Sequence, residues 1–561
     1  MKLDKIFLLG LAATGLLTTS CADLNTEPAG AVTGDQYSEA VTSDPSKLAS
    51  VVGSMFFQIG KEYNVYGQTS GRADDFGWPA QCLAEGTNAG DMVSQVSGYN
   101  WFSVACNYSD RNIGYANPYI RWSIFYNQIK ACNDLLNMIK SPSTTTLKQD
   151  WALAKALRAW DYLELVQQYA FTYKGHENDP SIPIYLSDNE EGHDTISSKR
   201  QSVSFVYSLI EKDLTEAASE LDGYTRPNKS YINQSVVYGL LARMALTKQD
   251  WSNAATYAQK AIDLASTDGV TPASISAMSK VGSMFYSKDE TNWMWGLSFD
   301  LSNIYTDGQY ETWVSQISSL ASNSYTTETG CYRCINSHLW NTIPSTDVRK
   351  GWWVDSVCKS PLIKGLTWTN SGETASLGTG CGNLLDYMPY TNVKFGCYQG
   401  TLGTTNTCGD FPMMRVEEMY LILAEAQGRQ NETTGAKTLE DFIKKYRDPS
   451  YTYASRPISN FVDEIWRQRR IELWGEGFAM GDILRLNKPM VRFLGSTDVV
   501  TNWPASYQFN LPANDKTLLM RINQSEINGN PDIDDEDNNT LGTVPSKGLN
   551  PALRDGVTDN Y

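Results

Sequence analysis

Apolar residues recur at intervals of three and four through long blocks of the chain, and this spacing constrains the fold more than any other feature. The clearest blocks are 119–139, 147–171, 203–221, 234–246, 251–265, 414–429 and 460–486. Such spacing is typical of amphipathic helices that pack one face against a core. Ser202 and Ser204 stand where an N-cap of the 203–221 block is expected. The pattern predicts a mainly α fold.

Two of these blocks also carry a repeat signal. Ala242, Ala254 and Ala261 are separated by 12 and 7 residues, the spacing at which the paired helices of tetratricopeptide repeats touch. The 12-residue spacing returns at Ala424 and Ala436. We therefore expect a tetratricopeptide-like scaffold of helical repeats.

The remaining stretches have a different composition. Residues 46–118 and 266–411 lose the helical period and gain Gly, Ser, Thr, Asn and Trp, which predicts long irregular loops and a few short strands. Binding functions concentrate in loops held by a rigid scaffold. The expected organisation is one domain over 46–561, with scaffold at about 119–265 and 412–490 and loop-rich binding regions between.

The N-terminus predicts export. Lys2 and Lys5 precede a twelve-residue apolar run, 6–17, and Cys21 follows shortly after. The run is too short for a membrane-spanning helix but suits a secretory signal. A cysteine directly after the signal is typical of bacterial lipoproteins, which predicts a signal peptide at 1–20, a lipid anchor on Cys21 and a tether over 21–45. The alternative is a plain signal with an incidental cysteine.

Composition excludes several functions. The chain has 63 Asp and Glu against 46 Lys and Arg, a net charge of −17, and such a surface repels nucleic acid. No common hydrolase, protease or nucleotide-binding motif occurs in its proper setting. Cys331 and Cys334 have zinc-knuckle spacing without a second pair or clustered histidines. We expect no metal and no cofactor, and one or two disulfides among residues 331–408, with the pairing left open.

Seven segments along the chain resemble the RagB/SusD family of outer-membrane nutrient-binding lipoproteins. The most recognisable is RVEEMYLILAEA at 415–426; the others are 122–133, 156–162, 180–183, 200–217, 469–486 and 524–531. The resemblance implies an all-α repeat fold and non-catalytic ligand binding. It also implies a partner, a TonB-dependent outer-membrane transporter over which the lipoprotein closes as a lid.

Several charged groups allow two interpretations. One set is either an anion site or a buried ion-pair network, and we favour the network: Arg469, Arg470, Glu472, Glu476, Asp482 and Arg485. The adjacent pair Asp74 and Asp75 is poorly placed for glycosidase chemistry, because neighbouring residues of an extended chain point to opposite faces. The acidic tail at 532–537 either holds calcium or is simply solvated, and we favour the second.

Sugars are held by exposed aromatic rings that stack on them and by polar groups that bond their hydroxyls. Tryptophans on helical apolar faces are assigned to the core: Trp122, Trp151, Trp160, Trp466 and Trp474. The candidate ligand-binding residues lie in polar, non-helical stretches: Arg72, Asp74, Asp75, Trp78, Asp91, Tyr99, Asn100, Trp101, Trp293, Trp295, Trp313 and Trp340.

These observations predict a cell-surface, glycan-binding lipoprotein. It would capture oligosaccharides and deliver them to a partner transporter without breaking a bond. A peptide-binding member of the same family is the nearest alternative. A surface glycoside hydrolase and a purely structural scaffold for other surface proteins are more distant alternatives.

Overall fold

A computed structural model describes residues 34–61, 72–96, 100–281, 285–299, 312–322, 324–370, 373–376, 387–540 and 544–559. The predicted signal peptide, the anchor Cys21, the first part of the tether and the candidate Tyr99 lie outside these residues.

Five long helices build the first part of the scaffold: α6 (Ala116–Met138), α7 (Thr145–Tyr169), α8 (Val203–Glu220), α9 (Gln234–Lys248) and α10 (Trp251–Thr267). Each coincides with a block of the predicted helical period, within about three residues at either end. Side chains of Thr144, Ser202, Asn233 and Asp250 cap the last four of them, which satisfies backbone N–H groups that have no partner within the helix.

The second part of the scaffold comprises α15 (Val416–Gln430), α16 (Glu432–Tyr446), α17 (Phe461–Glu472) and α18 (Ala479–Arg485). The sequence pattern predicted one helix over 460–486, whereas the chain breaks between α17 and α18. Gly475 and Gly477 adopt φ values of 82° and 90° there, a backbone conformation that glycine reaches without strain.

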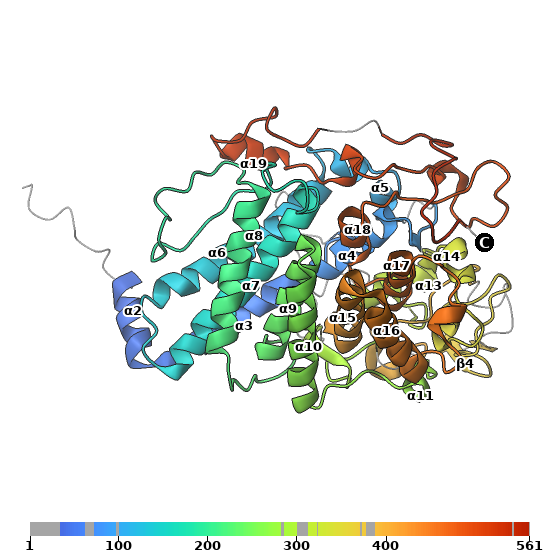
Figure 1. Cartoon of the computed structure of the whole chain (residues 1–561), viewed down its shortest axis with the longest axis horizontal. Coiled ribbons are helices and arrows are strands. Elements are labelled where there is room, and N and C mark those ends of the chain that lie inside the picture. The colour runs from blue at the N-terminus through green and yellow to red at the C-terminus, as the bar shows by residue number, and fades with distance from the viewer. Residues whose placement is uncertain are drawn as a thin grey trace, which may run out of the picture.

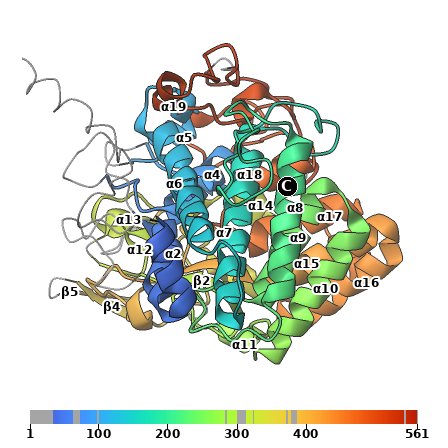
Figure 2. The same ribbon diagram turned by 90° about the vertical axis from the view of Figure 1, so that its left-hand side faces the viewer.

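The scaffold helices follow one another in space as they do in sequence. Successive helices from α6 to α10 pack side by side, and α10 then packs against α15, which packs against α16 (Figure 2). Ala242, Ala254, Ala261 and Ala424 are fully buried, as small residues must be where helices approach closely. The predicted mainly α scaffold with a repeat-like arrangement is confirmed.

Short elements fill the rest of the molecule. Helices precede the scaffold as α2 (Gly34–Ser43), α3 (Ala49–Phe57), α4 (Trp78–Asn88) and α5 (Ser103–Cys106). Between its two parts lie α11 (Ile275–Met278), α12 (Trp313–Ile317), α13 (Tyr325–Glu328) and α14 (Ser337–Asn341), and α19 (Gln524–Gly529) follows it. Figure 1 places α13, α14 and β4 at the end of the molecule opposite α2.

The strands form three antiparallel pairs in the described part of the chain. They are β1 (Met92–Val93) with β3 (Cys334–Ile335), β2 (Trp293–Leu297) with β6 (Phe411–Arg415), and β4 (Thr367–Asn370) with β5 (Glu373–Ser376). The first two pairs tie the loop-rich regions to each other and to the start of α15. None of the helices described here combines the length and the apolar character that crossing a bilayer requires.

Candidate functional site

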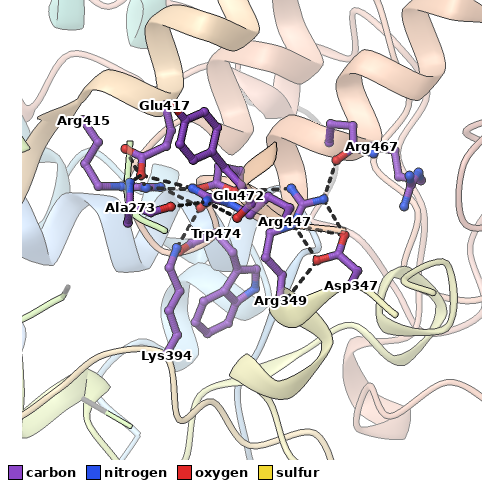
Figure 3. Close-up of polar contacts among 12 residues, drawn as sticks. Ala273, Asp347, Arg349, Lys394, Arg415, Glu417, Arg447, Arg467, Glu472 and Trp474 are labelled. Atoms are coloured by element: carbon purple, nitrogen blue, oxygen red, sulfur yellow. Dashed lines mark hydrogen bonds and ion pairs between the residues drawn. The ribbon is translucent and has the colours of Figure 1, made fainter. Parts of the chain in front are cut away.

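A buried network of ion pairs connects the loop regions to the second part of the scaffold (Figure 3). The Glu472 carboxylate accepts hydrogen bonds from Arg349, Arg415 and Arg447 at 2.7–3.3 Å. Arg415 also bonds Glu476 at 2.8 and 2.9 Å. These side chains are almost completely buried, so the part of the expected network that surrounds Glu472 is structural, as favoured from the sequence.

The acidic side chains of this network are paired with basic side chains. Burial by itself would raise the pKa of Glu472, but Arg447, Arg415 and Arg349 hold it well below its ordinary value. Lys394 donates to Glu476 at 2.7 Å, yet burial lowers its pKa to about 8. A network of this kind fixes elements in place and leaves few groups free for other chemistry.

Asp91 takes part in a similar ion pair. Its carboxylate accepts two hydrogen bonds from Arg470 Nε at 3.0 Å and one from Nη2 at 2.5 Å, and its backbone oxygen accepts from Trp474 Nε1 at 2.9 Å. Asp91 is 4% exposed. The structure therefore assigns this candidate to the interior, where it holds α17, and we leave it out of the binding surface.

Four candidate tryptophans are also corrected by the structure, since Trp78, Trp293, Trp295 and Trp313 are at most 4% exposed. Three of these rings pack edge-on against other core rings: Trp78 and Trp295 against Trp160, and Trp313 against Phe395 and Phe411. Trp293 and Trp295 lie in strand β2, whose polar flanks resemble a loop while the strand itself is buried, and Trp78 and Trp313 each begin a buried helix, α4 and α12.

Trp340 is half-buried and its faces are engaged. The Lys350 ammonium lies 4.1 Å from the ring centroid, the Tyr390 ring packs edge-on at 5.5 Å, and the indole N–H donates to the Lys350 carbonyl at 3.3 Å. In this arrangement the ring is not presented for stacking.

The remaining described candidates lie at the surface around Trp101 or directly beneath it. Its side chain is 38% exposed, and its indole N–H donates to Tyr325 Oη in α13 at 3.0 Å. The Arg72 guanidinium lies 5.3 Å from the ring centroid, a cation–π distance. We call Arg72, Trp101 and Tyr325 the aromatic surface site. It combines an exposed ring with two groups that can bond hydroxyls.

Arg72 is itself fixed by Asp74. Its Nε and Nη2 donate to the two Asp74 oxygens, each at 3.0 Å, and Asn117 in α6 donates to the same carboxylate at 3.1 Å. Asp74 is 5% exposed and Asp75 is 1% exposed. Asp74 therefore holds the site from below, and neither acid reaches the surface as a catalytic carboxylate would.

Asn100 supports Trp101 from the inside. Its side-chain oxygen accepts from the backbone N–H of Phe102 at 3.1 Å and from Arg333 at 3.3 Å, and its amide donates to the Gln95 carbonyl at 2.7 Å. At 3% exposure it cannot touch a ligand directly. It fixes the backbone on either side of the exposed ring.

Tyr325 is the one residue of this site that the sequence reasoning missed. It lies in the stretch SNSYTTETG, which is polar and lacks helical period. The criterion used for tryptophans, an aromatic residue in a polar, non-helical stretch, would have selected it.

The cysteines, the acidic tail and the potential metal ligands can each be compared with the sequence predictions. Cys358 is disulfide-bonded, within the range in which a disulfide was expected, whereas Cys331 and Cys334 are free thiols. Asp534 and Asp537 accept backbone N–H groups in turns of the acidic tail. No group of three or more potential metal ligands comes together among the described residues.

The sequence and the fold are both similar to those of known proteins. Two family models match, the SusD-like model described as starch-binding and associating with the outer membrane over residues 79–246, and the SusD family model over residues 367–539. No curated protein matches the sequence significantly.

Solved structures share the fold. A SusD-like carbohydrate-binding protein from Bacteroides vulgatus is 24% identical, with a TM-score of 0.68 over 89% of this chain and 98% of its own. SusD superfamily proteins from Bacteroides thetaiotaomicron and Parabacteroides distasonis are 20% and 17% identical, with TM-scores of 0.66 and 0.61. They cover 88% and 87% of this chain and 99% and 98% of their own. From these matches and the helical architecture, the chain belongs to the SusD/RagB family.

Proposed function

We propose that the protein is a cell-surface, glycan-binding lipoprotein that captures oligosaccharides without cleaving them. The observation that carries this proposal is the aromatic surface site, where the exposed Trp101 ring lies beside Arg72 and Tyr325. Rings of this kind stack on the C–H faces of sugars, and the flanking donors bond hydroxyls. Family membership supports the same role.

Delivery is the second part of the proposal. The captured oligosaccharide would pass to a partner TonB-dependent outer-membrane transporter, with this protein acting as its lid and Cys21 as its lipid anchor. Opening and closing would be a conformational step in which no bond is broken. A lasting lid needs an extensive interface, on the order of 2,000 Å² or more.

A glycan and peptide array probed with the purified protein lacking residues 1–21 tests the binding role. We expect saturable binding to oligosaccharides, with no release of reducing ends on incubation. Binding to peptides alone would instead support the peptide-binding alternative, and reducing ends would indicate a hydrolase.

Substitution then tests the site. Trp101→Ala should weaken binding of the array's best glycan about tenfold or more, since a stacking ring of this kind contributes more than about 1.4 kcal/mol. Phe205→Ala is the matched control, because Phe205 is 42% exposed on α8. Equal affinities of the two variants would exclude the aromatic surface site. For the anchor, Cys21→Ala should release the protein from the membrane fraction.

A further inference from the structure

Helices α4 and α7 carry polar side chains in the interior of the protein that have no hydrogen-bond partner. Gln81 and Glu85 are one turn apart on α4, and Asp161 and Gln168 lie two turns apart on α7. Gln81 Oε1, Glu85 Oε1, both Asp161 oxygens and both polar atoms of the Gln168 amide are buried without a hydrogen-bond partner. Buried polar atoms are nearly always bonded, so such a group requires an explanation.

Two of these residues, Glu85 and Gln168, line a cavity of about 70 Å³, whose wall also includes Arg469. These three residues are 5%, 9% and 3% exposed. Arg469 donates through Nε to Asp482 at 2.8 Å, while its Nη1 has no partner. The cavity is thus lined by two free donor groups, Gln168 Nε2 and Arg469 Nη1, and by one unbonded carboxyl oxygen, Glu85 Oε1.

The charges around this cavity are not balanced. Arg111 and Arg121 both pair with one carboxylate, Asp110, at 2.7 and 3.2 Å. The other side of the Arg121 guanidinium donates to Met520 Sδ at 3.3 Å, and a thioether is a weak acceptor. The other guanidiniums in the wall have carboxylates of their own: Arg243 has Glu418, Arg469 has Asp482 and Arg485 has Glu425.

Glu85 does not supply the missing negative charge at neutral pH. Burial raises its pKa to about 8; Arg121 and Arg111 lower it in part, and Glu164 raises it. Burial likewise raises the pKa of Glu164 to about 7, against the lowering effect of Arg243 and with Glu418 adding to the rise. Glu85 is therefore largely protonated near pH 7 and Glu164 is about half protonated, so these two carboxyls only partly offset the positive charge of Arg111 and Arg121.

We propose that this cavity binds a small carboxylate anion of the size of formate or acetate, held by Arg121, Arg469 and Gln168. Guanidinium and amide N–H groups bond carboxylate oxygens well. A cavity of about 150 Å³ binds benzene, so a cavity of about 70 Å³ suits a carboxylate of one or two carbons better than a sugar ring. The site is separate from the aromatic surface site and does not depend on it.

Titration of the purified full-length mature protein with ¹³C-formate, followed by NMR line broadening, tests this assignment. We expect saturable binding that is about tenfold weaker at pH 9 than at pH 7, because ionised Glu85 then competes for the same cation. Glu85→Gln keeps that side chain neutral and should hold the affinity at pH 9 close to its value at pH 7.

Gln168→Leu should weaken formate binding about tenfold at both pH values. Gln128→Leu is the matched control, because Gln128 is fully buried on α6 and its amide donates to the Met55 carbonyl at 2.8 Å. It lies outside the cavity wall, so this variant should bind as the wild type does. Gln168→Met serves as the second variant if the leucine variant does not fold. Absence of saturable binding to the wild type, equal binding by the Gln128 and Gln168 variants, or a crystal grown in formate with only waters in the cavity would each overturn the proposal.

Discussion

The orientation of the exposed Trp101 ring depends on a residue 224 positions further along the chain. Its indole N–H bonds Tyr325 Oη, so Tyr325→Phe removes one hydrogen bond and leaves the ring in contact with Arg72. A net hydrogen bond contributes about 0.5–1.5 kcal/mol, which predicts a two- to tenfold loss of glycan affinity by calorimetry. The unfolding temperature should not change; unaltered affinity would mean that Tyr325 does not orient the ring.

Asp161 is expected to make the stability of the protein depend on pH. It is fully buried and both its oxygens lack partners, and burial, with Glu164 adding to it, raises its pKa well above the ordinary value. The native state then holds a proton that the unfolded chain loses above about pH 4. Stability must fall as the pH rises from there, because the unfolded state binds fewer protons than the native state.

Asp161→Asn removes this titration while keeping the shape of the side chain. We expect the variant to be more stable than the wild type at pH 8, by about 2 kcal/mol, and to differ little from it at pH 4. Urea unfolding at the two pH values measures the difference. A variant less stable than the wild type at pH 8 would contradict the assignment of a neutral, unbonded Asp161.

The binding residues could be predicted from the sequence only in part. Aromatic and charged residues in a polar stretch indicate a surface, and this pattern predicts Arg72 and Trp101. The rule is correct for these two residues because the chain around them is irregular. The same rule failed for Trp293 and Trp295, because a five-residue strand is too short for its burial to be read from alternation. Whether a ring is covered depends on pairing with β6, which is more than a hundred residues away.

At the level of elements, the link between α17 and α18 is the sharpest departure from the predicted helices. Gly477 has φ 90°, and a Cβ added there would lie 2.6 Å from Cys82 Sγ in α4. Gly477→Ala should therefore cost about 2 kcal/mol or more, from backbone strain and the clash together. Chemical denaturation measures this loss.

Gly269→Ala separates the two contributions. Gly269 also has a positive φ, 76°, but an added Cβ there meets nothing within 4 Å, so only backbone strain of about 1 kcal/mol is expected. If both variants lost the same stability, the contact with Cys82 would contribute nothing.

The long helices were predictable because their stability depends on a period that the sequence displays. Their ends were predicted within a few residues, since caps such as Ser202 and Asp250 are local signals. The break after α17 depends on packing of Gly477 against Cys82, almost four hundred residues earlier in the chain, and no local pattern reports such a contact.

At the scale of the whole molecule, the network around Glu472 joins segments that are far apart in sequence. Arg349 follows α14, Arg415 ends β6, Arg447 follows α16 and Glu472 ends α17. One carboxylate thus connects the loop-rich middle region to three parts of the scaffold. Its removal is expected to affect the entire fold and not one element alone.

Glu472→Gln should lower the free energy of unfolding by about 3–5 kcal/mol, because three buried guanidiniums lose their shared negative charge. Glu211→Gln is the matched control: its partner Lys248 lies at 2.6 Å but the Glu211 side chain is 38% exposed, so a loss below about 1 kcal/mol is expected.

The pH dependence of stability gives an independent check on Glu472. Since the pKa of Glu472 is lower in the native state than in the unfolded chain, its stabilisation is complete above about pH 5 and declines as the pH falls below the ordinary glutamate value. Urea unfolding from pH 7 to pH 3 should therefore show a decline in the wild type that is shallower in Glu472→Gln, and parallel declines would mean that Glu472 does not carry this charge.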